Sequence, residues 1–233
     1  MDDAATLENF QLRASVAPLM AALTSLLHSA ALGQSCTGLY VWGGEGVGKS
    51  HLLQAACHGL SMSAPNSSGA LYLPLRELID YPPAAVLEGC DHTCLVAIDE
   101  LDAISERPDW QEALFHLFNR RRDAGLAQIY AGAGAPATYP DWLPDLRSRL
   151  GSLTVFQIPR FEEGELAALL QFRAGLRGLV LSDDVVQFIL SRAPRATTSL
   201  MALLDTLDEE ALARGRAVTV PLINELKVLF PDR

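Results

Sequence analysis

A chain of 233 residues is long enough for one moderate domain, or for a domain with a small appendage. Hydrophobic residues make up 49% of it and charged residues 20%, which excludes a disordered chain and indicates a globular protein with a real core. The net charge of −10 argues against a general nucleic-acid binder, because neutralising backbone phosphates requires surplus lysine and arginine.

The first segments of the chain bear on its targeting and on membrane association. Residues 1–10 are acidic and lack the positive region of a signal peptide. Residues 16–32 carry apolar side chains at helical spacing, and Gly33 is an expected C-cap. No apolar run reaches the roughly 18 residues that cross a bilayer. We therefore expect a cytoplasmic protein that does not associate with membranes.

Short apolar runs then alternate with amphipathic segments. The runs predict strands over residues 38–42, 70–75, 93–101, 127–134 and 153–159. Helices are predicted between them, one opening at Ser50 and another over 109–124. This alternation is typical of a parallel sheet with crossover helices.

The pattern changes after Pro159. From there on, the spacing of apolar residues predicts only helices, over residues 162–176, 182–193, 197–214 and 221–230. We therefore predict an α/β core over residues 1–160, followed by a small all-helical lid over residues 161–233.

The stretch GGEGVGKS, residues 43–50, fits the phosphate-loop pattern G-x-x-x-x-G-K-[ST]. Glycines let successive backbone N–H groups turn inward around phosphates, and the N-terminus of the following helix adds a favourable dipole. Lys49 would reach the β- and γ-phosphates, and the Ser50 hydroxyl would bind Mg²⁺. The residues expected to border the nucleotide are Gly43, Gly44, Gly46, Val47, Gly48, Lys49, Ser50 and His51.

A phosphate loop also needs an acid at the end of a nearby strand. The run LVAIDE, residues 95–100, supplies two. Asp99 is expected on the magnesium side of the nucleotide, and Glu100 is expected to polarise the attacking water. The loop and these acids together predict binding of ATP or ADP with Mg²⁺.

Positive charge is concentrated in two short segments. Residues 119–125 and 145–150 together hold five arginines. A local basic site on an otherwise acidic body is therefore an open alternative.

Several stretches resemble the AAA+ module of the DnaA family of bacterial replication initiators, especially its short, Hda-like members. They are GKSHLLQAA (48–56), LVAIDELDAI (95–104), EALFHLFNRRRDAG (112–125), LPDLRSRL (143–150) and LSDDVVQFIL (181–190). The resemblance runs from about residue 9 to the end and implies a Rossmann-like core with a helical lid. It also implies a function: Hda-like proteins sit on the DNA-loaded sliding clamp and stimulate hydrolysis of the ATP bound to DnaA. The chain ends at Arg233 without room for the DNA-reading domain of DnaA, so no stable binding to duplex DNA is expected.

The resemblance also implies an arginine finger, which stabilises charge on the γ-phosphate of a neighbouring subunit. The family motif places the finger at Arg149, and Arg147 is the runner-up. A surface arginine on a short helix is the structural alternative. A finger that acts on a neighbour implies at least transient association, including possible homo-oligomers.

Three departures from the family pattern affect the prediction. The clamp-binding peptide has only a poor match, at residues 11–15. Ala131 and Ala133 stand where a sensor hydroxyl and carboxylate are expected, and methyl groups cannot orient water. The sensor arginine of the lid falls on Thr198, with Arg195 as a possible substitute in contact with nucleotide. Because the phosphate-binding residues are intact and the sensor residues are altered, we predict that the chain binds nucleotide and hydrolyses it slowly on its own.

The predicted function is therefore an adenine-nucleotide-binding regulator that docks on a DnaA-type initiator and offers Arg149. Two alternatives remain open. The first is a non-catalytic adaptor that uses the AAA+ fold as a docking surface. The second is an ATPase that loads or remodels nucleic-acid machinery, as helicase loaders do.

Overall fold

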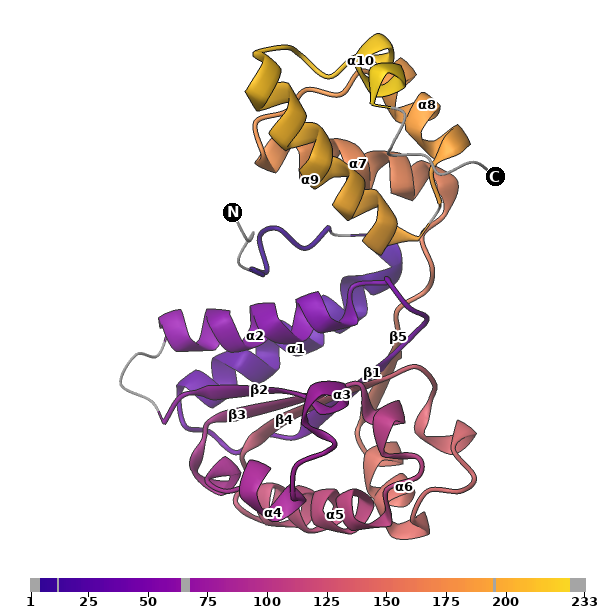
Figure 1. The fold of residues 1–233 in the computed structure, drawn as a ribbon. Coiled ribbons are helices and arrows are strands. Elements are labelled where there is room, and N and C mark those ends of the chain that lie inside the picture. Colours follow the sequence, from indigo (N-terminus) through magenta and orange to yellow (C-terminus); the bar gives the residue numbers. More distant parts are fainter. Residues whose placement is uncertain (1–4, 12, 64–67, 195, 227–233) are drawn as a thin grey trace. The chain divides into compact units, whose positions relative to one another are not determined.

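The computed structural model describes residues 5–11, 13–63, 68–194 and 196–226 (Figure 1). It divides into two compact units, Met1–Pro159 and Arg160–Arg233. The first contains a parallel sheet with helices on both faces, and the second is helical throughout its described part. The predicted α/β core followed by a small helical region is therefore confirmed.

Five parallel strands form the sheet, in the order β2-β3-β4-β1-β5. They are β1 (Gly38–Trp42), β2 (Ala70–Pro74), β3 (Leu95–Asp99), β4 (Ala127–Gly132) and β5 (Thr154–Gln157). Because the strands are parallel, their carboxyl ends meet at one edge of the sheet. The glycine loop follows β1 and the two acids follow β3, so they lie on either side of the end of β4.

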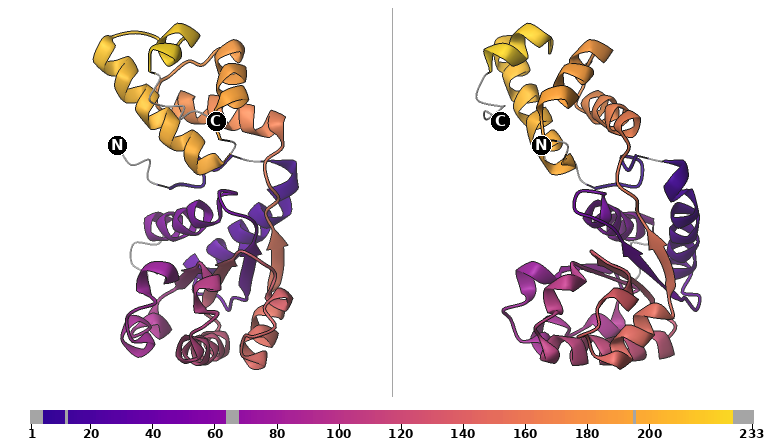
Figure 2. Two further views of the ribbon diagram at one scale, coloured as in Figure 1. Left: turned by 45° about the vertical axis from the view of Figure 1, so that its right-hand side comes forward. Right: turned by 90° about the vertical axis from the view of Figure 1, so that its right-hand side faces the viewer.

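Helices cover both faces of this sheet (Figure 2). Helices α1 (Ala17–Ala31) and α2 (Lys49–Ser63) pack on one face. Helices α5 (Pro108–Asp123) and α6 (Pro144–Gly151) pack on the other. The central strands are therefore apolar on both sides, as expected for a covered parallel sheet.

Alternate residues of a strand contribute to opposite layers, because successive side chains point to opposite faces. Leu39 and Val41 of β1 belong to the layer of α1 and α2, whereas Tyr40 belongs to the layer of α5 and α6. In β4, Ala131 is paired with Val41 and Tyr130 with Tyr40, so they follow the same division.

Short helical turns complete the first unit. They are η1 (Ala14–Val16), α3 (Leu75–Leu78), α4 (Pro83–Val86), η2 (Cys90–His92), η3 (Leu101–Ile104) and η4 (Pro136–Thr138). Three of them, α3, η3 and η4, follow the carboxyl ends of strands, where the candidate site lies.

One segment departs from the expectation about membranes. Within the described residues, Ala14–Ala31 is long and apolar enough, by length and composition, to cross a bilayer. The expectation that no segment would reach this length was wrong, because scattered serine, threonine and histidine do not lower the mean hydropathy far enough. A mostly buried core helix of a soluble protein passes the same test; here 28% of the segment is buried, and Leu19, Leu23 and Leu26 belong to the layer that covers the sheet.

The second unit contains four described helices around its own core. They are α7 (Glu163–Leu176), α8 (Asp183–Arg192), α9 (Thr197–Arg214) and α10 (Val220–Glu225). A capping box at Glu162 and Glu165 begins α7, and Gly215 in the left-handed region ends α9. The last predicted helix extends beyond Glu225 into residues that lie partly outside the described part of the chain.

Candidate nucleotide-binding site

The glycine loop connects β1 to α2, and its shape requires glycine at three positions. Gly46 and Gly48 have φ angles of 74° and 101°, a region that side chains rarely tolerate. At Gly43 a Cβ atom would lie 2.4 Å from the carbonyl oxygen of Ile158. The loop leads directly into the first turn of α2, which begins at Lys49. Its backbone therefore has the curvature and the helix terminus that phosphate binding requires.

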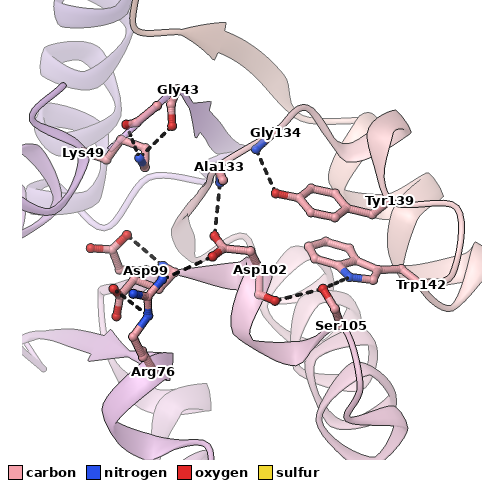
Figure 3. Close-up of polar contacts among 12 residues, drawn as sticks. Gly43, Lys49, Arg76, Asp99, Asp102, Ser105, Ala133, Gly134, Tyr139 and Trp142 are labelled. Carbon is pink, nitrogen blue, oxygen red and sulfur yellow. Dashed lines mark hydrogen bonds and ion pairs between the residues drawn. The ribbon is translucent and has the colours of Figure 1, made fainter. Parts of the chain in front are cut away.

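The side chain of Lys49 turns back into this loop (Figure 3). Its Nζ atom donates hydrogen bonds to the carbonyl oxygens of Gly43, at 2.7 Å, and Gly44, at 2.8 Å. Burial lowers the pKa of Lys49, while the nearby carboxylates of Asp99 and Asp102 oppose that shift. The ammonium group thus remains at the loop and faces the acids that follow β3.

The remaining predicted loop residues differ in what they can offer. The Val47 side chain is buried in the layer of α1 and α2, so only its backbone is available to a ligand. Ser50 is exposed in the first turn of α2. The ring of His51 stacks on Phe10 at a centroid distance of 6.0 Å, and its Nε2 atom lies 3.3 Å from the carbonyl oxygen of Thr6. His51 is therefore held by the segment that precedes the first helix.

Phe10 belongs to a segment that the sequence analysis did not place at the site. Its buried ring lies next to Gly48 as well as His51. Thr6 and Asn9 stabilise the turn before it through reciprocal bonds between backbone N–H groups and side-chain oxygens. The sequence shows one aromatic residue at the end of LENF, residues 7–10, but it does not reveal which surface the ring covers.

Asp99 is fully buried at the end of β3. One carboxylate oxygen accepts the backbone N–H of Glu100 at 2.8 Å, and the other accepts the Tyr72 hydroxyl at 2.8 Å. Burial is the main cause that raises the pKa of Tyr72, and hydrogen bonds from Gln54 and Ser50 oppose it. Tyr72 therefore holds the carboxylate of Asp99, one of the two residues predicted to bind magnesium. The sequence analysis missed this tyrosine, which lies on the neighbouring strand β2.

The residues fit a magnesium ion only as part of a nucleotide complex. Within the described ranges, no group of three or more histidine, cysteine, aspartate or glutamate side chains could hold a metal. Each Asp99 oxygen accepts one protein hydrogen bond and keeps a free lone pair. Phosphate oxygens and water would therefore have to complete the coordination beside Ser50 and Asp99.

Glu100 has left-handed backbone angles, φ 56° and ψ 44°, and is the only non-glycine residue with positive φ in the described part of the chain. Its carboxylate lies 3.3 Å from Nε of Arg76. The same guanidinium lies 3.4 Å from Asp102. The carboxylate of Glu100 is thus already paired with a cation that the sequence analysis did not identify. The partners are far apart in sequence, so no local pattern indicates the pair.

The end of β4 carries the two alanines that stand at expected sensor positions. Ala131 is fully buried in the layer of α1 and α2. The backbone N–H of Ala133 donates to Asp102 at 3.2 Å, and that of Gly134 donates to the Tyr139 hydroxyl at 2.8 Å. The backbone donors at this strand end are therefore bonded to side chains of the same chain (Figure 3).

Arg147 and Arg149 both lie on α6, but their side chains are used differently. Arg147 donates to the carbonyl oxygens of Tyr139 and Pro140. The Arg149 guanidinium makes no hydrogen bond or ion pair with any described residue. It lies in the last turn of α6, shortly before Thr154 begins β5 at the amino edge of the sheet. Arg149 therefore lies toward the edge opposite the chain's own glycine loop.

The arginine cluster on α5 does not form a free basic surface. Arg121 is fully buried and donates to the carbonyl oxygens of Cys90, Thr93 and Ala127. Arg120 and Arg122 pair with aspartates at 2.9 and 2.7 Å. The hypothesis of a local basic site here is therefore not supported, because internal carbonyls and neighbouring acids already use these charges.

Two predicted features fall wholly or partly outside the described residues. Arg195 is one of them, so its relation to the nucleotide stays a prediction. Thr198 is the second residue of α9 in the helical unit. In the weak clamp-peptide match, Leu12 is not described, and Arg13 donates to the carbonyl oxygen of Pro159 at 3.1 and 3.2 Å.

The helical unit matches the protein family described as "Hda, lid domain" over residues 162–226. The whole chain has the fold of domain III of the Thermotoga maritima replication initiation protein DnaA, with 20% sequence identity and a TM-score of 0.79 over 100% of this chain and 99% of that one. AMPPCP-bound DnaA from Aquifex aeolicus is 18% identical, with a TM-score of 0.75; 88% of this chain matches 65% of it.

The Thermotoga maritima RuvB Holliday junction branch migration motor shares the fold more distantly, at 16% identity and a TM-score of 0.67, over 96% of this chain and 72% of that one. Because these identities are below 25%, the likeness to solved structures concerns the fold. That fold is an AAA+ core followed by a helical lid.

Proposed function

We propose that this chain is a DnaA/Hda-like AAA+ protein and that it regulates replication initiation, because its helical unit matches the Hda lid domain and it has the fold of DnaA domain III. In this proposal it binds an adenine nucleotide, docks on the AAA+ domain of a DnaA-type initiator and stimulates hydrolysis of the initiator's ATP. The carrying observation is the Arg149 guanidinium, which has no partner among the described residues and lies toward the sheet edge opposite the chain's own glycine loop.

Nucleotide binding is supported by the glycine loop and its neighbours. Backbone N–H groups from Gly46 to Lys49 would surround the phosphates, and Lys49 would exchange its loop carbonyls for phosphate oxygens. Ser50 and Asp99 would hold Mg²⁺, with Tyr72 orienting the carboxylate. The similar DnaA from Aquifex aeolicus binds AMPPCP, which supports an adenine nucleotide here too.

Slow hydrolysis of the chain's own nucleotide follows from two features. Glu100, which would polarise the attacking water, is paired with Arg76. The end of β4 offers no polar side chain at Ala131 or Ala133, and the backbone N–H of Ala133 is bonded to Asp102. The nucleotide would therefore act as a switch or a structural ligand rather than as a rapidly consumed substrate.

Arg149 would act on the partner's nucleotide. A guanidinium beside a transferring γ-phosphoryl group stabilises charge that develops in the transition state, an effect of about 10³–10⁵ in rate. Its energetic contribution arises mainly in the transition state, so its loss should lower the maximum stimulation more than the affinity of docking.

The test is the ATPase activity of a purified DnaA-type initiator, measured with and without this chain. Arg149→Ala should remove most of the stimulation, whereas Arg122→Ala, an exposed arginine paired with Asp123, serves as the matched control. Loss of stimulation in Arg147→Ala but not in Arg149→Ala would move the finger to Arg147. Absence of stimulation by the unaltered chain would overturn the proposal.

One observation favours a second candidate, a non-catalytic adaptor. The backbone donors after β4 are bonded internally, as expected if this edge no longer takes part in hydrolysis. An adaptor would still be stabilised by nucleotide, by about 2.7 kcal/mol at 100 times the Kd, while partner ATPase stays flat. The helicase-loader alternative loses support because Arg121 is buried. Binding to a sliding clamp and self-association stay predictions.

A further inference from the structure

We propose that Tyr139 and Trp142 are positioning residues that fix helix α6, and with it Arg149, against the end of β4 and the turn that follows β3. The proposal rests on the function proposed above for Arg149. Residues 133–143 connect β4 to α6 and contain a single helical turn, η4. A connection of this kind can hold α6 in one place only if its side chains are tied to neighbouring elements.

The end of this connection nearest the sheet is bonded on both sides. Gly134 donates its N–H to the Tyr139 hydroxyl at 2.8 Å and accepts a bond from the Tyr40 hydroxyl at 2.9 Å. A Cβ atom at Gly134 would lie 2.4 Å from Oγ1 of Thr138. The tight turn at residue 134 therefore requires glycine, because a side chain there would clash with Thr138.

The stacked rings of Tyr139 and Trp142 connect Gly134 to Ser105, which follows η3. Tyr139 lies parallel to Trp142, with ring centroids 3.9 Å apart and planes inclined by 7° (Figure 3). The indole Nε1–H of Trp142 donates to Oγ of Ser105 at 3.2 Å. Ser105 in turn donates to the carbonyl oxygen of Asp102 at 2.8 Å. Trp142 is 2% exposed and belongs to the core, and the half-buried Tyr139 packs against it.

Asp102 joins these contacts to the candidate site. The carboxylate of Asp102 accepts the backbone N–H of Ala133, which is the start of the same connection. Asp102 also pairs with Arg76, the partner of Glu100. Asp102 therefore connects the Arg76–Glu100 pair to Ala133 and, through Ser105, to Trp142.

The first turn of α6 is tied to the same place. The backbone N–H of Leu143 donates to Oε1 of the buried Gln111 at 2.7 Å. The Nε2 group of Gln111 donates to the carbonyl oxygens of Ile104, at 2.9 Å, and Ser105, at 3.3 Å. Because α6 is a short helix, fixing its first turn fixes the direction of Arg149 in its last turn.

Two mild variants test the inference. Tyr139→Phe keeps the stacked ring and removes the hydroxyl that accepts the Gly134 N–H. Ser105→Ala removes an exposed hydroxyl without opening a cavity in the core. Ser191→Ala is the matched control, because it removes an exposed serine hydroxyl that donates to a carbonyl three residues earlier, in the helical unit.

The first readout is a titration of initiator ATPase with each variant. We expect the maximum stimulation to fall about fivefold, the equivalent of one ordinary hydrogen bond, with the half-saturating concentration little changed. Nucleotide binding by calorimetry should match that of the unaltered chain. Adding Arg149→Ala to either variant should cause no larger loss than Arg149→Ala alone, because both changes act through the same guanidinium.

The second readout needs no partner. Amide hydrogen exchange over Pro144–Gly151 should become faster in both variants and stay unchanged in Ser191→Ala. Normal stimulation and normal exchange in the two variants would overturn the positioning role while leaving the proposed function intact. If the unaltered chain does not stimulate the initiator at all, the proposed function fails, and the inference fails with it.

Discussion

Two adjacent places at the carboxyl edge of the sheet differ in how they use their polar groups. After β1, the loop carbonyls of Gly43 and Gly44 accept hydrogen bonds from the side chain of Lys49. After β4, the backbone donors of Ala133 and Gly134 are bonded to Asp102 and Tyr139. In the proposed function the Lys49 side chain exchanges the loop carbonyls for phosphate oxygens, whereas the backbone donors after β4 stay bonded within the fold. Binding and hydrolysis of nucleotide should therefore be separable in this protein.

The largest expected effect is a loss of nucleotide affinity at the glycine loop. Lys49→Ala removes the group that joins loop and phosphate, and we expect nucleotide affinity to fall about 100-fold, as for the loss of a strong charge-assisted contact. Calorimetric titration with ADP and with ATP measures it. Ser63→Ala, at the far end of the same helix, is the control. An unchanged affinity in Lys49→Ala would show that phosphates bind elsewhere.

A smaller effect concerns the acids that follow β3, on the other side of β4 from the glycine loop. Arg76→Ala frees Glu100 and Asp102 from their shared guanidinium. Exposed ion pairs contribute at most about 1 kcal/mol, so the slow ATPase activity proposed for this chain should rise by about fivefold or less. Arg120→Ala, which breaks a comparable pair with Asp91, should leave turnover unchanged. A fall in turnover would instead assign Arg76 to substrate binding.

Nucleotide affinity should also depend on pH. Burial lowers the pKa of Lys49 below 10.5 in the folded protein. Bound phosphate favours the ammonium form, so binding takes up protons, and affinity should fall by at most about tenfold per pH unit as pH rises through the lowered pKa. Folding without ligand depends on pH in the opposite direction. Between the lowered pKa of folded Lys49 and its value in the unfolded chain, the unfolded chain binds more protons, so the free energy of unfolding rises with pH.

Calorimetry in two buffers with different ionisation enthalpies measures the proton uptake directly. Lys49→Met should abolish the uptake and the stability change together, since both depend on one amine. If proton uptake persists in Lys49→Met, a group other than Lys49 takes up the proton on nucleotide binding, and the prediction is wrong.

Local patterns were sufficient for much of the fold. Alternating apolar runs and amphipathic segments predicted every strand of the sheet to within a few residues, and the glycine loop was expected between β1 and α2, where it lies. Each of these features depends on neighbours in sequence: strand alternation, helix periodicity and the backbone freedom of glycine. Asp99 and Glu100 were predicted for the same reason, because an apolar strand runs directly into them.

Only the tertiary structure decided how the polar groups around that loop are paired. Tyr72 reaches Asp99 across 27 positions of sequence, and Asp102 reaches Ala133 across 31. The arginines of α5 read as a charged segment, yet Arg121 is buried because internal carbonyls lie within its reach. Sequence periodicity specifies which face of an element is apolar. Which partners meet at an edge depends on strand order and side-chain direction, and these are set when the layers pack.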